Sequence, residues 1–133
     1  MAAELHQSTR LFEGVPYAYA ATARKADLVF TAGACPLDDQ GHVVAPGDIA
    51  AQTRQALDNL RVVLEECGAT LRDVLKTTVY VASGDRGDLV AAWTEVASAF
   101  GDHDAPSTLL GVAMLGYPDQ LVEIEAIAAV PGA

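Results

Sequence analysis

Basic residues are scarce in this chain of 133 residues, which has 8 Lys and Arg against 18 Asp and Glu and a formal net charge of −10. The cations are dispersed along the sequence and form no basic stripe, although clustered Lys and Arg are what proteins use to bind phosphate backbones. Nucleic acid is therefore not expected as a partner. A small neutral or cationic metabolite suits the charge of the chain better.

Cysteine is nearly absent as well, with only Cys35 and Cys67 and no C-x-x-C pair. His6, His42 and His103 stand far apart in polar stretches, so no cluster has the spacing of a zinc site. The sequence thus predicts no metal site, and we expect both thiols to be reduced.

Long apolar runs are missing too. Hydrophobic residues make up 51% of the chain, yet no run approaches the roughly 20 residues of a membrane helix. The first residues have neither the basic segment nor the apolar core of a signal peptide. We therefore expect a cytoplasmic protein that does not contact the membrane. Its length predicts one hydrophobic core, with an N-terminal arm at residues 1–14 and a single domain at 15–133.

The chain does contain alternating strand and helix patterns. Runs of β-branched and apolar residues predict a short edge strand at 9–12 and further strands at 17–23, 28–32, 75–81, 107–115 and 121–130. The polar turn after residue 23 predicts that the strands on either side of it form a hairpin.

Two stretches have the apolar spacing of amphipathic helices. The first starts after Asp48, a good N-cap, and ends at Gly68, with Cys67 expected at the buried end of its apolar stripe. The second starts after Asp88 as its cap and ends at Gly101.

The resulting order, ββαβαββ, is that of an α+β fold with a mostly antiparallel sheet and both helices on one face. The other face stays uncovered in a chain this apolar, which favours self-association. On the last strand, Glu123 and Glu125 share one face while their apolar neighbours share the other. A solvated acidic face would be ordinary surface, whereas a face covered by another subunit would place the acids in a cleft suited to proton transfer.

Four segments, in this order and at this spacing, resemble the Rid family: LVFTAG at 28–33, DIAAQTRQALDNL at 48–60, VLKTTVYV at 74–81 and VEIEAIA at 122–128. These proteins are the reactive intermediate deaminases, also called YjgF-like and, under an older label, endoribonuclease L-PSP. The resemblance covers nearly the whole chain, from Pro16 to Val130.

The resemblance implies a chorismate-mutase-like fold, a homotrimer and a ligand cleft at each subunit interface. It also implies hydrolysis of reactive enamines and imines to a keto acid and ammonia, with neither a metal nor an organic cofactor. By position, Glu123 matches the catalytic glutamate beside the attacking water, while Tyr17 and Gly33 match residues of the cleft. Ala32 stands where the family has a serine.

The arginine that holds the substrate carboxylate in the family matches Ser107, and no Lys or Arg occurs from Asp102 to the end. A hydroxyl cannot replace a guanidinium that binds a carboxylate through two charge-assisted hydrogen bonds. We therefore predict a substrate without a carboxylate, bound by Ser107, Thr108 and Leu109 together with the backbone of Gly33.

Two further residues assigned to the substrate site have a second interpretation. Trp93 has the spacing of a core residue of the second predicted helix as well as that of a substrate platform. Cys35 follows Gly33 and is interpreted as a lining thiol. To act as a nucleophile it would need a lowered pKa, and no His or Lys lies near it in the sequence.

Three functions follow from these observations. The retained Glu123 favours a hydrolase that acts on a neutral or cationic imine or enamine. The missing arginine and the missing hydroxyl at Ala32 favour a protein that binds a small ligand in the same cleft without turnover. The acidic balance of the chain disfavours the ribonuclease of the older label.

Overall fold

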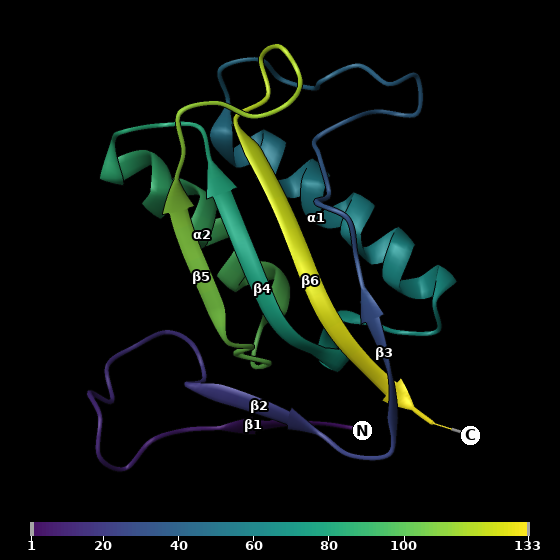
Figure 1. Cartoon of the computed structure of the whole chain (residues 1–133). Coiled ribbons are helices and arrows are strands. Elements are labelled where there is room, and N and C mark those ends of the chain that lie inside the picture. Colours follow the sequence, from purple (N-terminus) through teal and green to yellow (C-terminus); the bar gives the residue numbers. More distant parts are fainter. Residues whose placement is uncertain (1, 133) are drawn as a thin grey trace.

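The computed structural model describes residues 2–132 and has a four-stranded sheet with two helices on one face (Figure 1). The sheet order is β3-β6-β4-β5, and a separate pair of strands, β1 and β2, lies at one end of this sheet. The strands are β1 Ala3–His6, β2 Ala20–Ala23, β3 Ala26–Phe30, β4 Val74–Val81, β5 Ser107–Gly111 and β6 Val122–Pro131. The helices are α1 Ile49–Glu66 and α2 Arg86–Phe100, with a short 3-10 turn at Leu71–Asp73.

Strand β6 lies between β3 and β4 and runs antiparallel to both, while β4 and β5 are parallel. This arrangement confirms the α+β class and the mostly antiparallel sheet. The apolar residues of β6 are buried beneath the helices: Val122, Ile124, Ala126 and Ala128. Tyr80 stands opposite Glu123 and Thr78 opposite Glu125. These four polar side chains therefore share the face that carries no helix, as the alternation predicts.

The pairing of the N-terminal strands differs from the predicted hairpin, which is wrong. β2 pairs with β1, where Ala20 stands opposite His6, and β3 pairs with β6 instead. An apolar strand pattern indicates that a segment is extended, but it does not specify the partner. Strand β6 has 10 residues, and β4 occupies only one of its edges, so the other edge is available to β3.

The edge strand predicted at 9–12 is also wrong, because residues 9–11 form a bend instead of a strand. The Ser8 hydroxyl accepts hydrogen bonds from the N–H groups of Arg10 and Leu11, which is a local alternative to strand pairing. Strand β1 falls within the predicted arm at 1–14. The division into an arm and a domain stays a prediction.

The first helix begins and ends as predicted, but its last thiol does not lie where we expected. The Asp48 carboxylate accepts a hydrogen bond of 3.0 Å from the Ala51 N–H, and Gly68 follows the helix with a φ of +80°. Cys67 is exposed, not buried, because it is the C-cap residue and lies beyond Leu64, the last buried position of the helix.

The N-cap of the second helix lies three residues before the predicted one. Asp85 is the N-cap and accepts a hydrogen bond of 2.8 Å from the Gly87 N–H. Asp88 lies in the first turn instead, where it accepts a hydrogen bond of 2.6 Å from the Ser83 hydroxyl. Both aspartates have the chemistry of a cap, so the sequence did not distinguish them. Gly101 ends the helix with a φ of +61°, as predicted.

Strand β5 is shorter than the predicted 107–115 and ends at Gly111. Its partner β4 ends at Val81, opposite Gly111, so the following residues have no strand to pair with. Gly111 also passes close to the loop after β4, where an added Cβ would lie 2.6 Å from the Ser83 carbonyl oxygen.

Candidate functional site

The Glu123 carboxylate is held from two sides at the start of β6. Its Oε1 accepts hydrogen bonds of 3.2 Å from the Gln120 amide and of 3.2 Å from the Cys35 thiol. Its other oxygen, Oε2, lies directly over Gly33, where an added Cβ would overlap it. Three segments of the chain therefore fix one acid: β6, the loop before it and the segment after β3.

A bulge after β3 brings Gly33 and Cys35 to this acid. The N–H of Thr31 donates to the Ala126 carbonyl, and Ala34 exchanges two backbone hydrogen bonds with Ile124. Residues 31 and 34 are three positions apart, but their partners on β6, residues 126 and 124, are only two positions apart. The segment after β3 therefore contains one residue more than a regular ladder, which defines a bulge. The extra residue lets the chain pass close under Glu123, where an added Cβ at Gly33 would force the carboxylate to move.

Gly33 offers a direct test of this close approach. We expect Gly33→Ala to fold, since no positive φ is required there, but to displace the Glu123 carboxylate and lower any Glu123-dependent turnover by about 100-fold. The matched control is Gly84→Ala, because a Cβ at Gly84 would meet no atom within 4 Å. Equal activity in the two variants, measured beside circular dichroism spectra, would contradict the placement.

The half-buried thiol of Cys35 is not poised for nucleophilic attack. Burial, together with the hydrogen bond to Glu123 and the charge of that carboxylate, raises the pKa of Cys35 from 9.0 to about 11. With this raised pKa, the side chain is a neutral thiol near pH 7. A nucleophilic cysteine needs a lowered pKa instead. It serves here as a hydrogen-bond donor. Sequence analysis placed Cys35 near the site but missed its contact with Glu123.

Five of the predicted substrate residues line a single hollow of about 440 Å³ at the open edge of β5: Tyr17, Trp93, Ser107, Thr108 and Leu109. Pro16 completes the lining and was missed, although it directly precedes Tyr17. Within the described range 2–132, no charged side chain lines this hollow. It therefore offers aromatic surface and hydroxyl groups, and it suits a small uncharged ligand or a cation that can lie against a ring.

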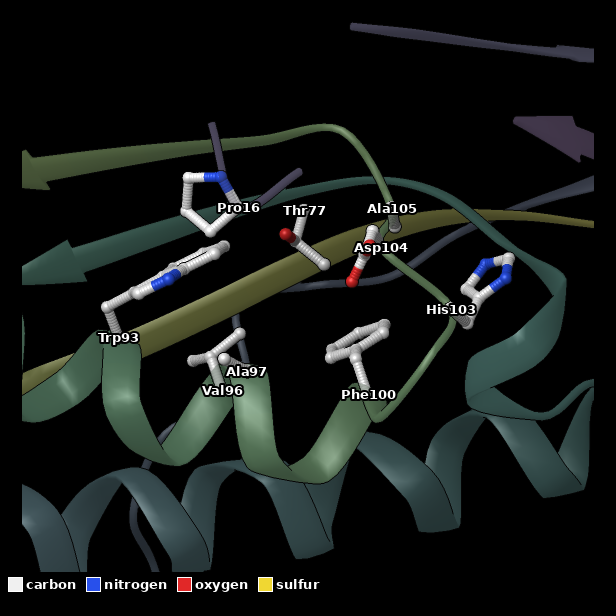
Figure 2. A pocket seen from close by; sticks show the side chains of 9 residues that line it. All are labelled: Pro16, Thr77, Trp93, Val96, Ala97, Phe100, His103, Asp104 and Ala105. Atoms are coloured by element: carbon white, nitrogen blue, oxygen red, sulfur yellow. The ribbon is translucent and has the colours of Figure 1, made fainter. Parts of the chain in front are cut away.

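The segment around Tyr17 is held against the start of β5. The Ala18 N–H donates a hydrogen bond of 2.7 Å to the Asp104 carbonyl, and the Tyr17 and Tyr19 rings meet edge to face. Figure 2 shows a second, smaller pocket, with Pro16 over the indole of Trp93, and these two residues also line the hollow. Trp93 thus joins the two predicted roles, since it packs against the core and also lines the hollow.

The hydroxyls of Ser107 and Thr108 point to opposite faces of the sheet. Ser107 accepts a hydrogen bond of 2.7 Å from Thr77, which is buried beneath the helices. Thr108 accepts a hydrogen bond of 2.6 Å from the Lys76 ammonium on the face without helices. Sequence analysis missed this contact, because Lys76 lies on β4, far from Thr108 in the chain. Lys76 shares a small hollow of about 160 Å³ with Glu125.

Within one chain, Glu123 and the hollow beside Ser107 are separate. Glu123 stands opposite Tyr80 and Ser107 opposite Thr77, on either side of β4. Three residues along a strand and two strand spacings amount to roughly 14 Å. The Ser107 hydroxyl also faces the helices, whereas Glu123 lies on the other face. One copy of the chain therefore does not bring the predicted acid and the predicted ligand pocket together.

Comparison with known proteins identifies the family that has this architecture. The sequence model of the family described as endoribonuclease L-PSP matches residues 13–130. A crystal structure of a Rid-family protein of unknown function from Yersinia pestis superimposes with a TM-score of 0.91, covering 98% of this chain and 100% of that one at 29% identity. The chain belongs to the Rid family.

Rid-family relatives extend over most of the sequence. A RutC family protein of Pyrococcus horikoshii is 38% identical over 110 residues, which are 83% of this chain and 85% of the relative. An Escherichia coli protein named 2-iminobutanoate/2-iminopropanoate deaminase is 35% identical over 105 residues, 77% of this chain and 79% of the relative. The Rid-family assignment and its chorismate-mutase-like α+β fold are thus confirmed.

Among residues 2–132, no three His, Cys, Asp or Glu side chains gather closely enough to hold a metal ion. In the same described range, no helix is long and apolar enough to cross a membrane.

Proposed function

We propose that this Rid-family protein hydrolyses a small imine or enamine that lacks a carboxylate, in clefts formed between the subunits of a homotrimer. The observation that carries this proposal is the held Glu123 carboxylate, with two donors on Oε1 and Gly33 beneath Oε2. A fixed carboxylate with one oxygen left to exchange protons is the arrangement that general acid–base catalysis requires.

In the proposed reaction, Glu123 takes a proton from a water molecule as the water oxygen forms a bond to the imine carbon. The proton is then returned to the nitrogen, which gives a carbinolamine. The hydroxyl proton of this carbinolamine next passes through Glu123 to the nitrogen, so that the carbon–nitrogen bond breaks, ammonia leaves and the carbon keeps oxygen as a carbonyl group. An enamine first gains a proton on carbon and loses one from nitrogen, and so becomes the imine. No oxidant, reductant or cofactor enters this balance.

The separation of Glu123 from the hollow supports a cleft made by two copies. A second copy can place its Glu123 beside the Ser107 hollow of the first, which one chain cannot do. The face without helices also exposes large apolar side chains, with Leu28, Phe30 and Leu110 exposed by 52%, 68% and 42%. Apolar side chains on an uncovered sheet face favour contact with another copy.

The substrate class follows from the lining of the hollow. The E. coli relative is named for 2-imino acids, which carry a carboxylate. In this chain the position that the resemblance assigns to the carboxylate-binding arginine is Ser107, and none of the described residues that line the hollow carries a charged side chain. A carboxylate buried beside Ser107 would have no guanidinium to pair with, since the Lys76 ammonium bonds to Thr108 on the other face of the sheet, and an unpaired buried charge costs several kcal/mol. Aromatic Tyr17 and Trp93 would instead contact an apolar substituent.

Two matched probes test this proposal. Phenylacetaldimine, formed in situ from phenethylamine by an amine oxidase, differs from 2-imino-3-phenylpropanoate, formed from phenylalanine by an amino-acid oxidase, by one carboxylate. We expect the protein to accelerate loss of the first imine, with ammonia release, far more than loss of the second. If neither imine disappears faster than in buffer, the hydrolase proposal fails.

The uncharged hollow also supports a second candidate, a binding protein without turnover. Trp93 and Tyr17 provide a ligand surface, whereas among the described lining residues the Tyr17 phenol is the only acid or base. This candidate predicts a ligand that raises the melting temperature and is recovered unchanged. The ribonuclease activity in the family description is disfavoured by the net charge of −10.

A further inference from the structure

We infer that Cys35 is a positioning residue for Glu123, whose thiol hydrogen bond fixes Oε1 and so selects Oε2 as the oxygen that meets the reacting water. The catalytic part of this inference rests on the proposed hydrolase function. The contact between thiol and carboxylate can be measured without it.

The hydrogen-bond donors around Glu123 give its two carboxylate oxygens different roles. The thiol of Cys35 and the amide of Gln120 both point to Oε1, each at 3.2 Å. Among residues 2–132 no hydrogen bond reaches Oε2, which lies over the Gly33 backbone. Two donors on one carboxylate oxygen leave it little capacity to take a further proton, so proton exchange is directed to the other oxygen.

The position of the thiol is itself fixed by the core. The Asn59 amide on α1 donates hydrogen bonds of 2.9 Å to the carbonyl oxygens of both Cys35 and Leu37. Pro36 between them is buried. The thiol therefore does not rest on a loose loop, since its backbone is tied to the helix layer on both sides. A side chain held in this way can orient its partner.

The chemistry of a thiol suits this role at the working pH of a hydrolase. A neutral S–H donates to a carboxylate, whereas a thiolate would repel it. The raised pKa of Cys35 keeps the side chain in the donating form near pH 7. Serine would also donate, and valine would fill similar space without a donor. These two substitutions separate hydrogen bonding from packing.

The contact can be tested by alkylation in a Cys67→Ser background, where Cys35 is the single thiol. We expect Glu123→Gln to raise the rate of Cys35 alkylation by iodoacetamide at pH 8.5 by about threefold, since loss of the carboxylate favours the thiolate. The matched control is Glu125→Gln, which removes a carboxylate that does not contact Cys35. Equal rates in the two variants would overturn the contact.

The positioning role is tested with phenylacetaldimine as the probe. We expect Cys35→Val to lower kcat by about tenfold with little change in KM and to alter the pH profile of kcat, while Cys35→Ser keeps kcat within about threefold of the parent. Equal kcat values for the valine and serine variants would reduce Cys35 to a packing role. Should the parent protein show no turnover, the hydrolase proposal fails, and the alkylation result still decides the contact.

Discussion

Replacing Glu123 with glutamine is expected to lower kcat for phenylacetaldimine by about 10³-fold while KM changes little. General acid–base groups contribute roughly 10²–10⁴-fold to rate, and glutamine keeps the shape of the side chain but can neither take nor return a proton. Glutamine can still accept the hydrogen bonds of Gln120 and Cys35 through its carbonyl oxygen, so the local structure should hold.

Glu125→Gln is the matched control for this variant. Glu125 lies two residues further along the same face of β6, but its carboxylate accepts a hydrogen bond from Tyr80 and does not contact Gly33 or Cys35. We expect this variant to stay within a few-fold of the parent. Similar losses in both variants would mean that the acidic face as a whole, and not the held carboxylate, determines the rate.

The second large effect concerns substrate choice at position 107. Ser107→Arg is expected to raise the ratio of kcat/KM for 2-imino-3-phenylpropanoate over phenylacetaldimine by about 100-fold. A guanidinium in the hollow supplies the missing counter-charge, and a hydrogen-bonded charge pair is worth about 1.5–3 kcal/mol. The hollow of about 440 Å³ has room for the longer side chain.

Ser107→Met is the control that adds length without charge. Both variants lose the hydrogen bond from the buried Thr77 hydroxyl, so both should unfold about 1–3 kcal/mol more easily. Comparable stability with different specificity would assign the change to the positive charge. If methionine shifts the ratio as far as arginine does, the absence of a carboxylate-binding charge does not define the substrate.

The sequence predicted the elements of the fold whose signals are local. The alternation along β6 placed Glu123 and Glu125 opposite the buried residues, because strand geometry alone decides which face a side chain takes. Asp48 and Gly68 delimited α1 for the same reason. The pairing of β1 with β2 was missed, because the partner of a strand depends on contacts with distant segments. The residue pattern within the strand does not specify that partner.

The candidate site was predictable only in part for a related reason. Tyr17, Trp93 and Ser107 line one hollow, but their role in binding a substrate stays a prediction. The resemblance to Rid proteins supplied that expectation for Tyr17 and Ser107. The contact of Cys35 with Glu123 spans 88 positions of sequence, and Lys76 reaches Thr108 over 32 positions. Such contacts depend on the bulge after β3 and on the parallel register of β4 with β5, neither of which the residue pattern specifies.

Mixing two inactive variants tests the shared cleft most directly. Glu123→Gln removes the acid, and Ser107→Trp fills the hollow, so each protein alone should be inactive. If each cleft takes its acid from one copy and its hollow from the next, co-refolding at equal amounts should restore about a quarter of the parent activity, because a quarter of the clefts combine two intact halves. A mixture as inactive as its parts, in particles shown to contain both variants, would contradict the account.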